Sequence, residues 1–425
     1  MVTTANIELW LEQLSVEYLK LIADNFKAQA EARFRGEQST LHMYPSFLHK
    51  KDITPVSKPI VALDLGGSHI RVAAFNLAEN GSLQILPGSE VMEASYPHLE
   101  TEFAAYCEFI ATFSKGFLDK YKLTELGGMG ISYSYPAKML QNGANIDASR
   151  EGMGEDWGKG FIVKDSAVNI SEKLKNAFAE KGIKSEKCIT LNDVVALYLS
   201  LKEANLSVVV GTGYNIGVAD REGNIYNTEA AFFQDEIVEA TFSRPAFHYV
   251  NELKEKVSKF GGTEDEVLDA KKFSEVQISG RYLYKLLLGG LLMLGEGNIE
   301  LIDSICTMET ECLTNILKND FVEIEKKINM ALTPLQKRNL FDLTEMLVRR
   351  SEDLVAAELA GAAKVAGLES GNIVIAADGS VINNLPDFKL HIVQKINSVL
   401  PSAKVEIKTV DHSGLWGAAR AVMMS

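Results

Sequence analysis

Residues 60–77 read IVALDLGGSHIRVAAFNL, and this stretch decides the fold. An apolar run that contains Asp64 is broken by Gly66-Gly67-Ser68 and followed by a second apolar run. The pattern predicts a strand, a glycine turn and another strand. Such a turn exposes successive backbone N–H groups, which attract phosphate oxygens. Ser68 adds a hydroxyl donor, and Asp64 is placed to hold a metal ion through water. The alternative is a plain hairpin capped by Asp64.

Two further glycine turns follow apolar runs later in the chain. One is Gly211-Thr212-Gly213 and the other is Gly379-Ser380. Each alone is also explained as an ordinary strand-end turn, but three such turns in one chain favour a cleft that binds a polyphosphate. Helical patterns lie between the turns, so the chain is expected to be an α/β protein with at least two sheets.

The composition narrows the classes of partner. The chain has 425 residues, 46% of them hydrophobic and 24% charged, with a formal net charge of −14. These values exclude a disordered chain and allow two domains or one large split domain. The acidic balance argues against binding to nucleic acid or to an anionic membrane surface, because both need a basic face. We therefore expect neither partner.

The spacing of the cysteines and the lengths of the apolar segments indicate the cellular compartment. Cys107, Cys188, Cys306 and Cys312 lack metal-binding spacing and are expected to be free thiols in a reducing compartment. Residues 1–7 lack the features of a secretory signal, and no segment offers about 18 uninterrupted apolar residues. We expect a soluble, cytoplasmic protein.

A carboxylate follows another predicted strand. Asn192-Asp193 comes directly after the apolar run 188–191 and opens a helical pattern. The carboxyl end of a strand is where open α/β sheets place their chemistry. An aspartate there can accept the proton of an attacking hydroxyl during phosphoryl transfer. Taken alone, the pair is better explained as a helix N-cap, for which Asn and Asp are both favoured.

Other polar residues suit a polyhydroxyl ligand. Asn215 follows the second glycine turn, Glu229 and Glu275 lie beside apolar residues, and Lys159 stands between two glycines. Carboxylates accept hydrogen bonds from sugar hydroxyls, and amides both donate and accept. Taken singly, each of these charges is better explained as a solvated surface group.

In their order along the chain, these motifs resemble the hexokinase family of sugar kinases nearly from end to end. No single motif is decisive, but the ordered set is specific. The matching pieces are STLHMYPSF (39–47), LDLGGS (63–68) with Arg71, SYP (134–136), WGKGF (157–161), Asn192-Asp193, GTGYN (211–215), NTE (227–229), Glu275 before ISGRY (278–282), ADGS (377–380), and SG (413–414) before GAA (417–419).

The resemblance implies a two-lobed, actin-like (ribonuclease H-like) ATPase fold, in which each lobe is a mixed sheet flanked by helices and a cleft separates the lobes. It implies that Mg-ATP donates its γ-phosphoryl group to the 6-hydroxyl of a hexose, with glucose expected, and that the lobes close on the sugar. Asp193 would be the catalytic base and Lys159 a second catalytic group. The remaining roles implied are hexose binding by Ser134, Lys159, Asn192, Asn215, Glu229 and Glu275, ATP binding by Gly66, Gly67, Ser68, Arg71, Gly211, Thr212, Gly379 and Ser380, and Mg²⁺ placement by Asp64.

The same resemblance implies lobe boundaries. Residues 1–57 are expected to pack on a large lobe formed by residues 193–412. Residues 58–192 are expected to form a small lobe, which residues 413–425 complete.

The chain departs from the family pattern at several positions. His69 stands where the family usually has Asn, Gly158 where it has Thr, and Ala230 where it has Trp. Three alternatives stay open: a kinase for another hexose or an N-acetylhexosamine, a glucokinase of the repressor/open-reading-frame/kinase type, and a non-catalytic sugar-sensing regulator. The second type usually carries a Cys-rich zinc motif, which this sequence lacks.

Overall fold

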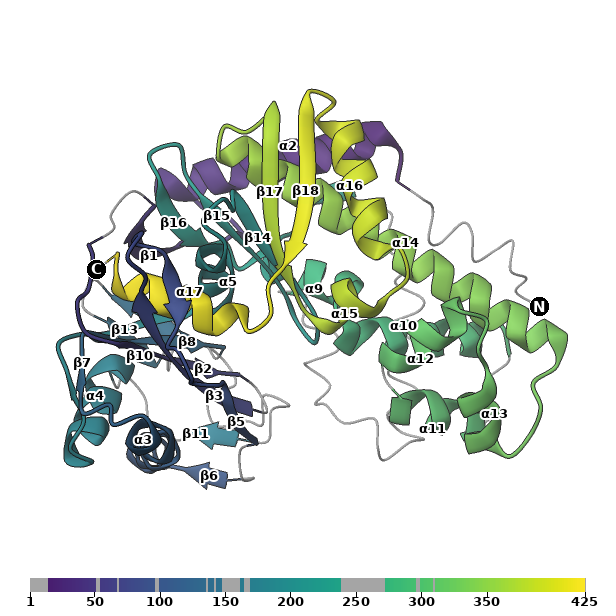
Figure 1. The fold of residues 1–425 in the computed structure, drawn as a ribbon. Helices are drawn as coiled ribbons and strands as arrows, with labels where there is room; N and C mark the ends of the chain where they lie inside the picture. The colour runs from purple at the N-terminus through teal and green to yellow at the C-terminus, as the bar shows by residue number, and fades with distance from the viewer. Residues whose placement is uncertain are drawn as a thin grey trace. The chain divides into compact units, whose positions relative to one another are not determined.

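The computed structural model describes residues 14–50, 54–66, 69–95, 99–134, 137–140, 143–146, 161–163, 169–237, 272–295, 299–308 and 310–424 (Figure 1). The helices are α2 (Val16–Phe34), α3 (Phe103–Lys120), α4 (Ile170–Glu180), α5 (Asp193–Ser200), the 3₁₀ helix η1 (Ala230–Phe232), α9 (Phe273–Ile278), α10 (Gly280–Met293), α11 (Ile299–Met308), α12 (Thr310–Leu317), α13 (Val322–Ile328), α14 (Pro334–Val365), α15 (Ser380–Asn384), α16 (Phe388–Val399) and α17 (Ser413–Val422). The strands are β1 (Tyr44–His49), β2 (Ile60–Leu65), β3 (His69–Leu77), β4 (Leu83–Ile85), β5 (Met92–Ser95), β6 (Leu99–Thr101), β7 (Glu125–Leu126), β8 (Gly128–Tyr133), β9 (Ala137–Leu140), β10 (Gly143–Ile146), β11 (Phe161–Val163), β12 (Lys184–Ser185), β13 (Cys188–Asn192), β14 (Leu206–Val210), β15 (Tyr214–Ala219), β16 (Asn224–Asn227), β17 (Gly371–Asp378) and β18 (Ala403–Thr409).

The chain forms two compact units and two large sheets. Unit 1 contains residues 1–43, 208–216 and 228–408, and unit 2 contains residues 44–207, 217–227 and 409–425. One sheet has the order β13-β8-β2-β3-β4, with β5 also paired to β3, and the other has the order β1-β16-β15-β14-β17-β18. The first sheet is mixed, because β13, β8 and β2 run parallel while β3 is antiparallel to β2.

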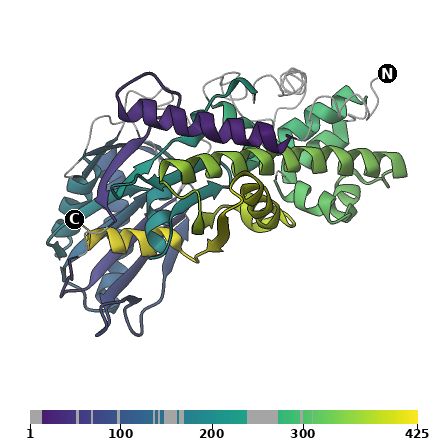
Figure 2. The ribbon, with the colours of Figure 1, turned by 90° about the horizontal axis from the view of Figure 1, so that it is seen from above.

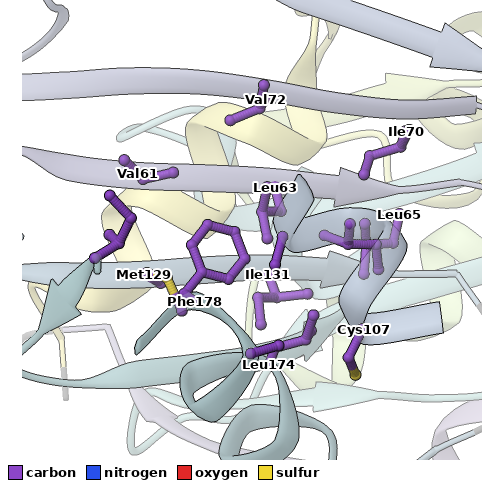
Figure 3. Packing of buried hydrophobic residues seen from close by; sticks show 14 of the residues in the cluster. Val61, Leu63, Leu65, Ile70, Val72, Cys107, Met129, Ile131, Leu174 and Phe178 are labelled. Carbon is purple, nitrogen blue, oxygen red and sulfur yellow. The ribbon is translucent and has the colours of Figure 1, made fainter. Parts of the chain in front are cut away.

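Unit 2 has its core on both faces of the first sheet. One face packs on α3 and α4, and Figure 3 shows apolar side chains of β2 and β8 with Leu174 and Phe178 of α4. Helix α17 packs on β8, β2 and β13. A Cβ atom added at Gly130 would lie 2.0 Å from the Ala418 carbonyl oxygen, and one at Gly417 would lie 1.8 Å from the Ala196 carbonyl oxygen. Glycine therefore lets α17 approach both β8 and α5.

Unit 1 is organised around the long helix α14. Thr333 and Gln336 form a capping box at its start, and Pro334 occupies the first turn, where its missing N–H costs nothing. Helix α2 runs beside α14, as Figure 2 shows. A Cβ at Gly361 would lie 2.7 Å from Cβ of Phe26, so glycine permits this contact.

Helical spacing over residues 7–36 predicts one or two amphipathic helices; helix α2 spans Val16–Phe34, and residues 1–13 lie outside the described residues. The structure differs from the sequence patterns in two places. The segment 41–48, which contains Pro45, reads in the sequence as an extended linker, but residues 44–49 form strand β1, an outer strand of its sheet. Pro45 fits there because an edge strand does not need every N–H. The pattern of residues 417–424 predicts a short final helix, which in the structure begins earlier, at Ser413.

The prediction of free thiols is confirmed for three of the four cysteines. Cys107, Cys188 and Cys312 are free thiols. Within the described ranges, no helix combines the length and the apolar character needed to cross a membrane.

A buried carboxyl on α14 makes stability depend on pH. The Glu352 side chain is 2% exposed, its Oε1 lies 3.0 Å from Nδ1 of His391, and burial raises its pKa from 4.5 to about 7. A carboxyl whose folded pKa is raised stabilises the fold at low pH, and this contribution is lost as the pH rises through about 7. The free energy of unfolding of E352Q minus that of wild type should therefore increase from pH 5 to pH 8, by about 3 kcal/mol at most. Urea denaturation at both pH values measures this difference, and a difference that does not change with pH contradicts the prediction.

Candidate active site

The ends of three parallel strands bring predicted residues of unit 2 together. Strand pairing aligns Leu65 with Tyr133 and Tyr133 with Asn192. A predicted site residue directly follows the end of each strand: Gly66 follows β2, Ser134 follows β8 and Asp193 follows β13. Adjacent strands lie about 4.8 Å apart, so Asp193 is about 10 Å from Gly66 across the sheet. The Ser134 N–H donates to the Leu65 carbonyl oxygen at 3.2 Å, which fixes the loop start beside the glycine turn.

Asn192 and Asp193 have different roles at the start of α5. Asn192 is the N-cap residue, and its Oδ1 accepts from the Val194 N–H at 3.0 Å. Asp193 is the first helical residue, and its Oδ1 accepts from the same N–H at 2.8 Å. Both side chains are half-buried, whereas Val194 onward is buried. The helix N-cap that the sequence offers as an alternative is therefore present, and the N-cap residue is Asn192. The Asp193 carboxylate follows it at the end of strand β13.

The first glycine turn is held by ion pairs on its flanking strands. Asp64 and Arg71 face each other across the β2–β3 pair, with 3.2 Å between Oδ2 and Nη1. Arg71 Nε also donates to Glu93 Oε2 at 2.5 Å, and this hydrogen bond holds the pKa of Glu93 below its ordinary value. The Gly66 N–H donates to the His69 carbonyl oxygen at 3.1 Å.

Asp64 also meets the first turn of helix α17. A Cβ added at Gly414 would lie 2.5 Å from Asp64 Oδ1 and 3.0 Å from Ser132 Oγ. A side chain at position 414 would displace the Asp64 carboxylate, so glycine lets the helix start approach that carboxylate. The Ser132 hydroxyl is buried, with no hydrogen-bond partner among the described residues. Sequence reasoning missed Ser132, although a polar residue within the apolar run 128–133 was a usable signal.

The donor set at Asp64 suits a magnesium ion bound through water. Across the described part of the chain, no group of three or more His, Cys, Asp or Glu side chains could hold a metal directly. Mg²⁺ commonly keeps several waters and takes one or two carboxylates together with substrate phosphates. Asp64, which is 14% exposed, and the unpartnered Ser132 hydroxyl fit that pattern.

In unit 1 the second and third glycine turns pack backbone against backbone. Gly379 has φ of +114°, and a Cβ there would lie 2.4 Å from the Val210 carbonyl oxygen. A Cβ on Gly211 would lie 3.3 Å from the Ser380 nitrogen. Thr212 and Ser380 are exposed at these turns. The absence of side chains thus leaves a backbone cradle of the kind that phosphate groups occupy.

The polar residues predicted for the sugar pocket of unit 1 are tied to the second glycine turn. Glu275 is 8% exposed, and its Oε2 accepts from the Tyr214 N–H at 3.1 Å. Asn215 Oδ1 accepts from the N–H groups of Ile216 at 2.8 Å and Ala230 at 3.3 Å. Glu229 is half-buried and has a left-handed backbone with φ of +54°. Non-glycine residues adopt this conformation rarely, and it recurs at functional sites.

The predicted residues thus fall into two sets, one in each unit. Unit 2 contains Asp64, Gly66, Arg71, Ser134, Asn192 and Asp193, and unit 1 contains Gly211, Thr212, Asn215, Glu229, Glu275, Gly379 and Ser380. Gly67, Ser68 and Lys159 lie outside the described residues.

Comparisons with known proteins agree over the whole chain. Two family models described as hexokinase match residues 8–202 and 205–424. Hexokinase-2 of Saccharomyces cerevisiae is 24% identical over 401 residues, covering 88% of this chain and 80% of the relative. Hexokinase-2 of Candida albicans is 23% identical over 446 residues, covering 96% and 90%. The solved hexokinase of Schistosoma mansoni, complexed with glucose, has a TM-score of 0.78 at 18% identity, covering 98% of each chain.

The two hexokinase family models identify the chain as an ATP-dependent sugar phosphotransferase, and its actin-like α/β fold agrees with them. The chain belongs to the hexokinase family.

Proposed function

We propose that this hexokinase transfers the γ-phosphoryl group of Mg-ATP to the 6-hydroxyl of glucose, with Asp193 as the catalytic base. The observation that carries the proposal is the strand register, which aligns Asp193 with Ser134 and with the first glycine turn. The Schistosoma mansoni hexokinase of similar fold was solved in complex with glucose, and this supports the choice of hexose.

The base needs a fixed position and an available oxygen lone pair. Helix α5 is buried from Val194 to Ser200, so it holds Asp193 rigidly at the strand end. A carboxylate oxygen that accepts one backbone N–H keeps further lone pairs. In the proposed step, the Asp193 carboxylate takes the proton of the 6-hydroxyl while that oxygen bonds to the γ-phosphorus and the bond to the β-phosphate oxygen breaks. Lys159 is the second catalytic group of the proposal.

The glycine turns are proposed to bind ATP. Gly66, Gly67, Ser68, Arg71, Gly211 and Thr212 would hold the phosphates, and Gly379 and Ser380 would lie near the nucleoside. Asp64 would hold Mg²⁺ through water, and the ion would neutralise phosphate charge.

The hexose is proposed to bind Ser134, Lys159, Asn192, Asn215, Glu229 and Glu275. We assign residues 58–192 and 413–425 to a small lobe, and residues 193–412, with residues 1–57 packed on them, to a large lobe. Closure of the lobes on the sugar would exclude water, and this would suppress idle ATP hydrolysis.

A sugar panel tests this function. ADP release should be measured for glucose, mannose, fructose and N-acetylglucosamine, with kcat and KM for each. We expect the highest kcat/KM for glucose, and nuclear magnetic resonance of the product should place the phosphate on the 6-hydroxyl. A higher kcat/KM for another sugar of the panel would contradict the glucose assignment, and a phosphate elsewhere would contradict the proposed acceptor.

A further inference from the structure

A buried carboxyl on α14 joins three separate segments of unit 1. Glu358 Oε2 accepts from the Tyr214 hydroxyl at 3.0 Å, and Glu358 Oε1 lies 2.7 Å from Ser274 Oγ. Ser274 Oγ also lies 3.0 Å from the Phe233 carbonyl oxygen. Glu358 and Ser274 are 0% exposed and Tyr214 is 3% exposed, so this network is closed to bulk solvent. We call it the Tyr214–Glu358–Ser274 chain.

The number of available hydrogens fixes which group donates in each hydrogen bond of the Tyr214–Glu358–Ser274 chain. The Ser274 hydroxyl has one hydrogen but two oxygen neighbours, Glu358 Oε1 and the Phe233 carbonyl oxygen. A carbonyl oxygen cannot donate, so Ser274 makes two full, two-centre hydrogen bonds only if Glu358 donates. Tyr214 then donates to Glu358, Glu358 donates to Ser274, and Ser274 donates to Phe233. This requires a protonated, neutral Glu358.

The surroundings of Glu358 favour the neutral form. Burial raises the pKa of Glu358 to about 8, and the negative charge of Asp235 also acts to raise it. The contacts of Glu358 with Ser274 and Tyr214 act in the opposite direction and do not offset burial. Burial also raises the pKa of Tyr214 well above its ordinary value, so its hydroxyl keeps the hydrogen that it donates.

Each segment that the Tyr214–Glu358–Ser274 chain joins to α14 carries a residue of the proposed sugar pocket. Tyr214 precedes Asn215, and Ser274 precedes Glu275. Phe233 directly follows η1, which begins one residue after Glu229. We propose that Glu358, as a neutral donor and acceptor, is the positioning residue that sets Asn215, Glu229 and Glu275 in register for hexose binding. The inference rests on the proposed function in one respect, that these three residues bind the hexose.

Two substitutions separate this role from simple packing. In E358Q the amide oxygen can accept from Tyr214 and the amide N–H can donate to Ser274, so the whole chain is retained. E358Q should therefore keep KM for glucose within about twofold of wild type, whereas E358A, which leaves buried groups unpaired, should raise it about tenfold. In both variants kcat should change less than about threefold, because Asp193 is untouched. Y214F removes one link and should give an intermediate KM.

The matched control is Glu352, another buried carboxyl on α14, which contacts His391 of α16. E352Q should leave KM for glucose unchanged. An E358Q variant as defective as E358A would overturn the neutral-donor assignment. An unchanged KM in E358A, or in Y214F if E358A does not fold, would overturn the positioning role.

One measurement needs no substrate. Infrared difference spectroscopy between wild type and E358Q at pH 6.5 should show the carbonyl stretch of a protonated carboxyl group in wild type only. A carboxylate band in its place would overturn the inference. Should the wild-type enzyme bind no glucose, the proposed function fails while the infrared result still decides the protonation of Glu358.

Discussion

We expect D193N to lower kcat at least about a hundredfold, the low end of the effect expected for loss of a general base. Asparagine is close in shape to aspartate, and its Oδ1 can still accept from the Val194 N–H, so the start of α5 is preserved. The amide cannot take up the proton of the sugar hydroxyl. We expect hexose affinity, measured by isothermal titration calorimetry, to change only a few-fold, and the melting temperature to stay near that of wild type.

A second substitution separates catalysis from helix capping. D193A should lose turnover as D193N does and should also cost up to about 1 kcal/mol of stability. N169A removes the N-cap of α4, where Asn169 Oδ1 accepts from the Glu172 N–H at 2.9 Å. It should lower stability by a similar amount and leave kcat unchanged. Near-normal turnover in D193N would remove Asp193 from the role of base.

The second large effect is expected from G379A. The φ of Gly379 is +114°, outside the regions that other residues adopt readily, and a Cβ would meet the backbone of Val210 at 2.4 Å and of Gly211 at 2.7 Å. The substitution must therefore push the third glycine turn away from the second. Strain and clash together should lower the free energy of unfolding by about 3 kcal/mol or more. In protein that still folds, KM for ATP should rise at least about tenfold, because the cradle is displaced.

Gly371, the first residue of strand β17, provides the control, whereas Gly379 directly follows the end of that strand. It also has a positive φ, of +80°, but a Cβ added there meets nothing within 4 Å. G371A should cost only about 1 kcal/mol, the ordinary penalty of a left-handed conformation, and should leave KM for ATP unchanged. Chemical denaturation and ATP titrations of both variants measure the contrast. Equal effects on KM for ATP would show that the packing of the two turns does not shape the nucleotide site.

Local patterns were sufficient to predict the strand–turn–strand units. The apolar run before Gly66 could only be buried, and the glycines that follow it break the run, so β2 and β3 were predictable from residues 60–77 alone. The α/β class and the hexokinase family followed from the order of such pieces. The assignments of the base, the hexose ligands and the lobe boundaries stay predictions.

What the sequence could not supply was pairing between distant residues. The alignment of Leu65 with Tyr133 and Asn192 depends on strand register, which no local pattern fixes. Strand β1 was missed because Pro45 argues against a strand unless the strand lies at an edge. In the sequence, Glu358 is one of several charged residues in a helical pattern. Its partner Tyr214 is 144 residues away, so no local pattern indicates their hydrogen bond.

The packing of α17 also affects how the nascent chain folds. This helix covers β2, β8 and β13 and meets Asp64, yet the ribosome makes it only after β14 to β18. Until then one apolar face of the finished sheet stays uncovered, so unit 2 cannot complete its folding during translation of the preceding strands. Such late, long-range closure is expected to slow the folding of unit 2 and to prolong its exposure to aggregation.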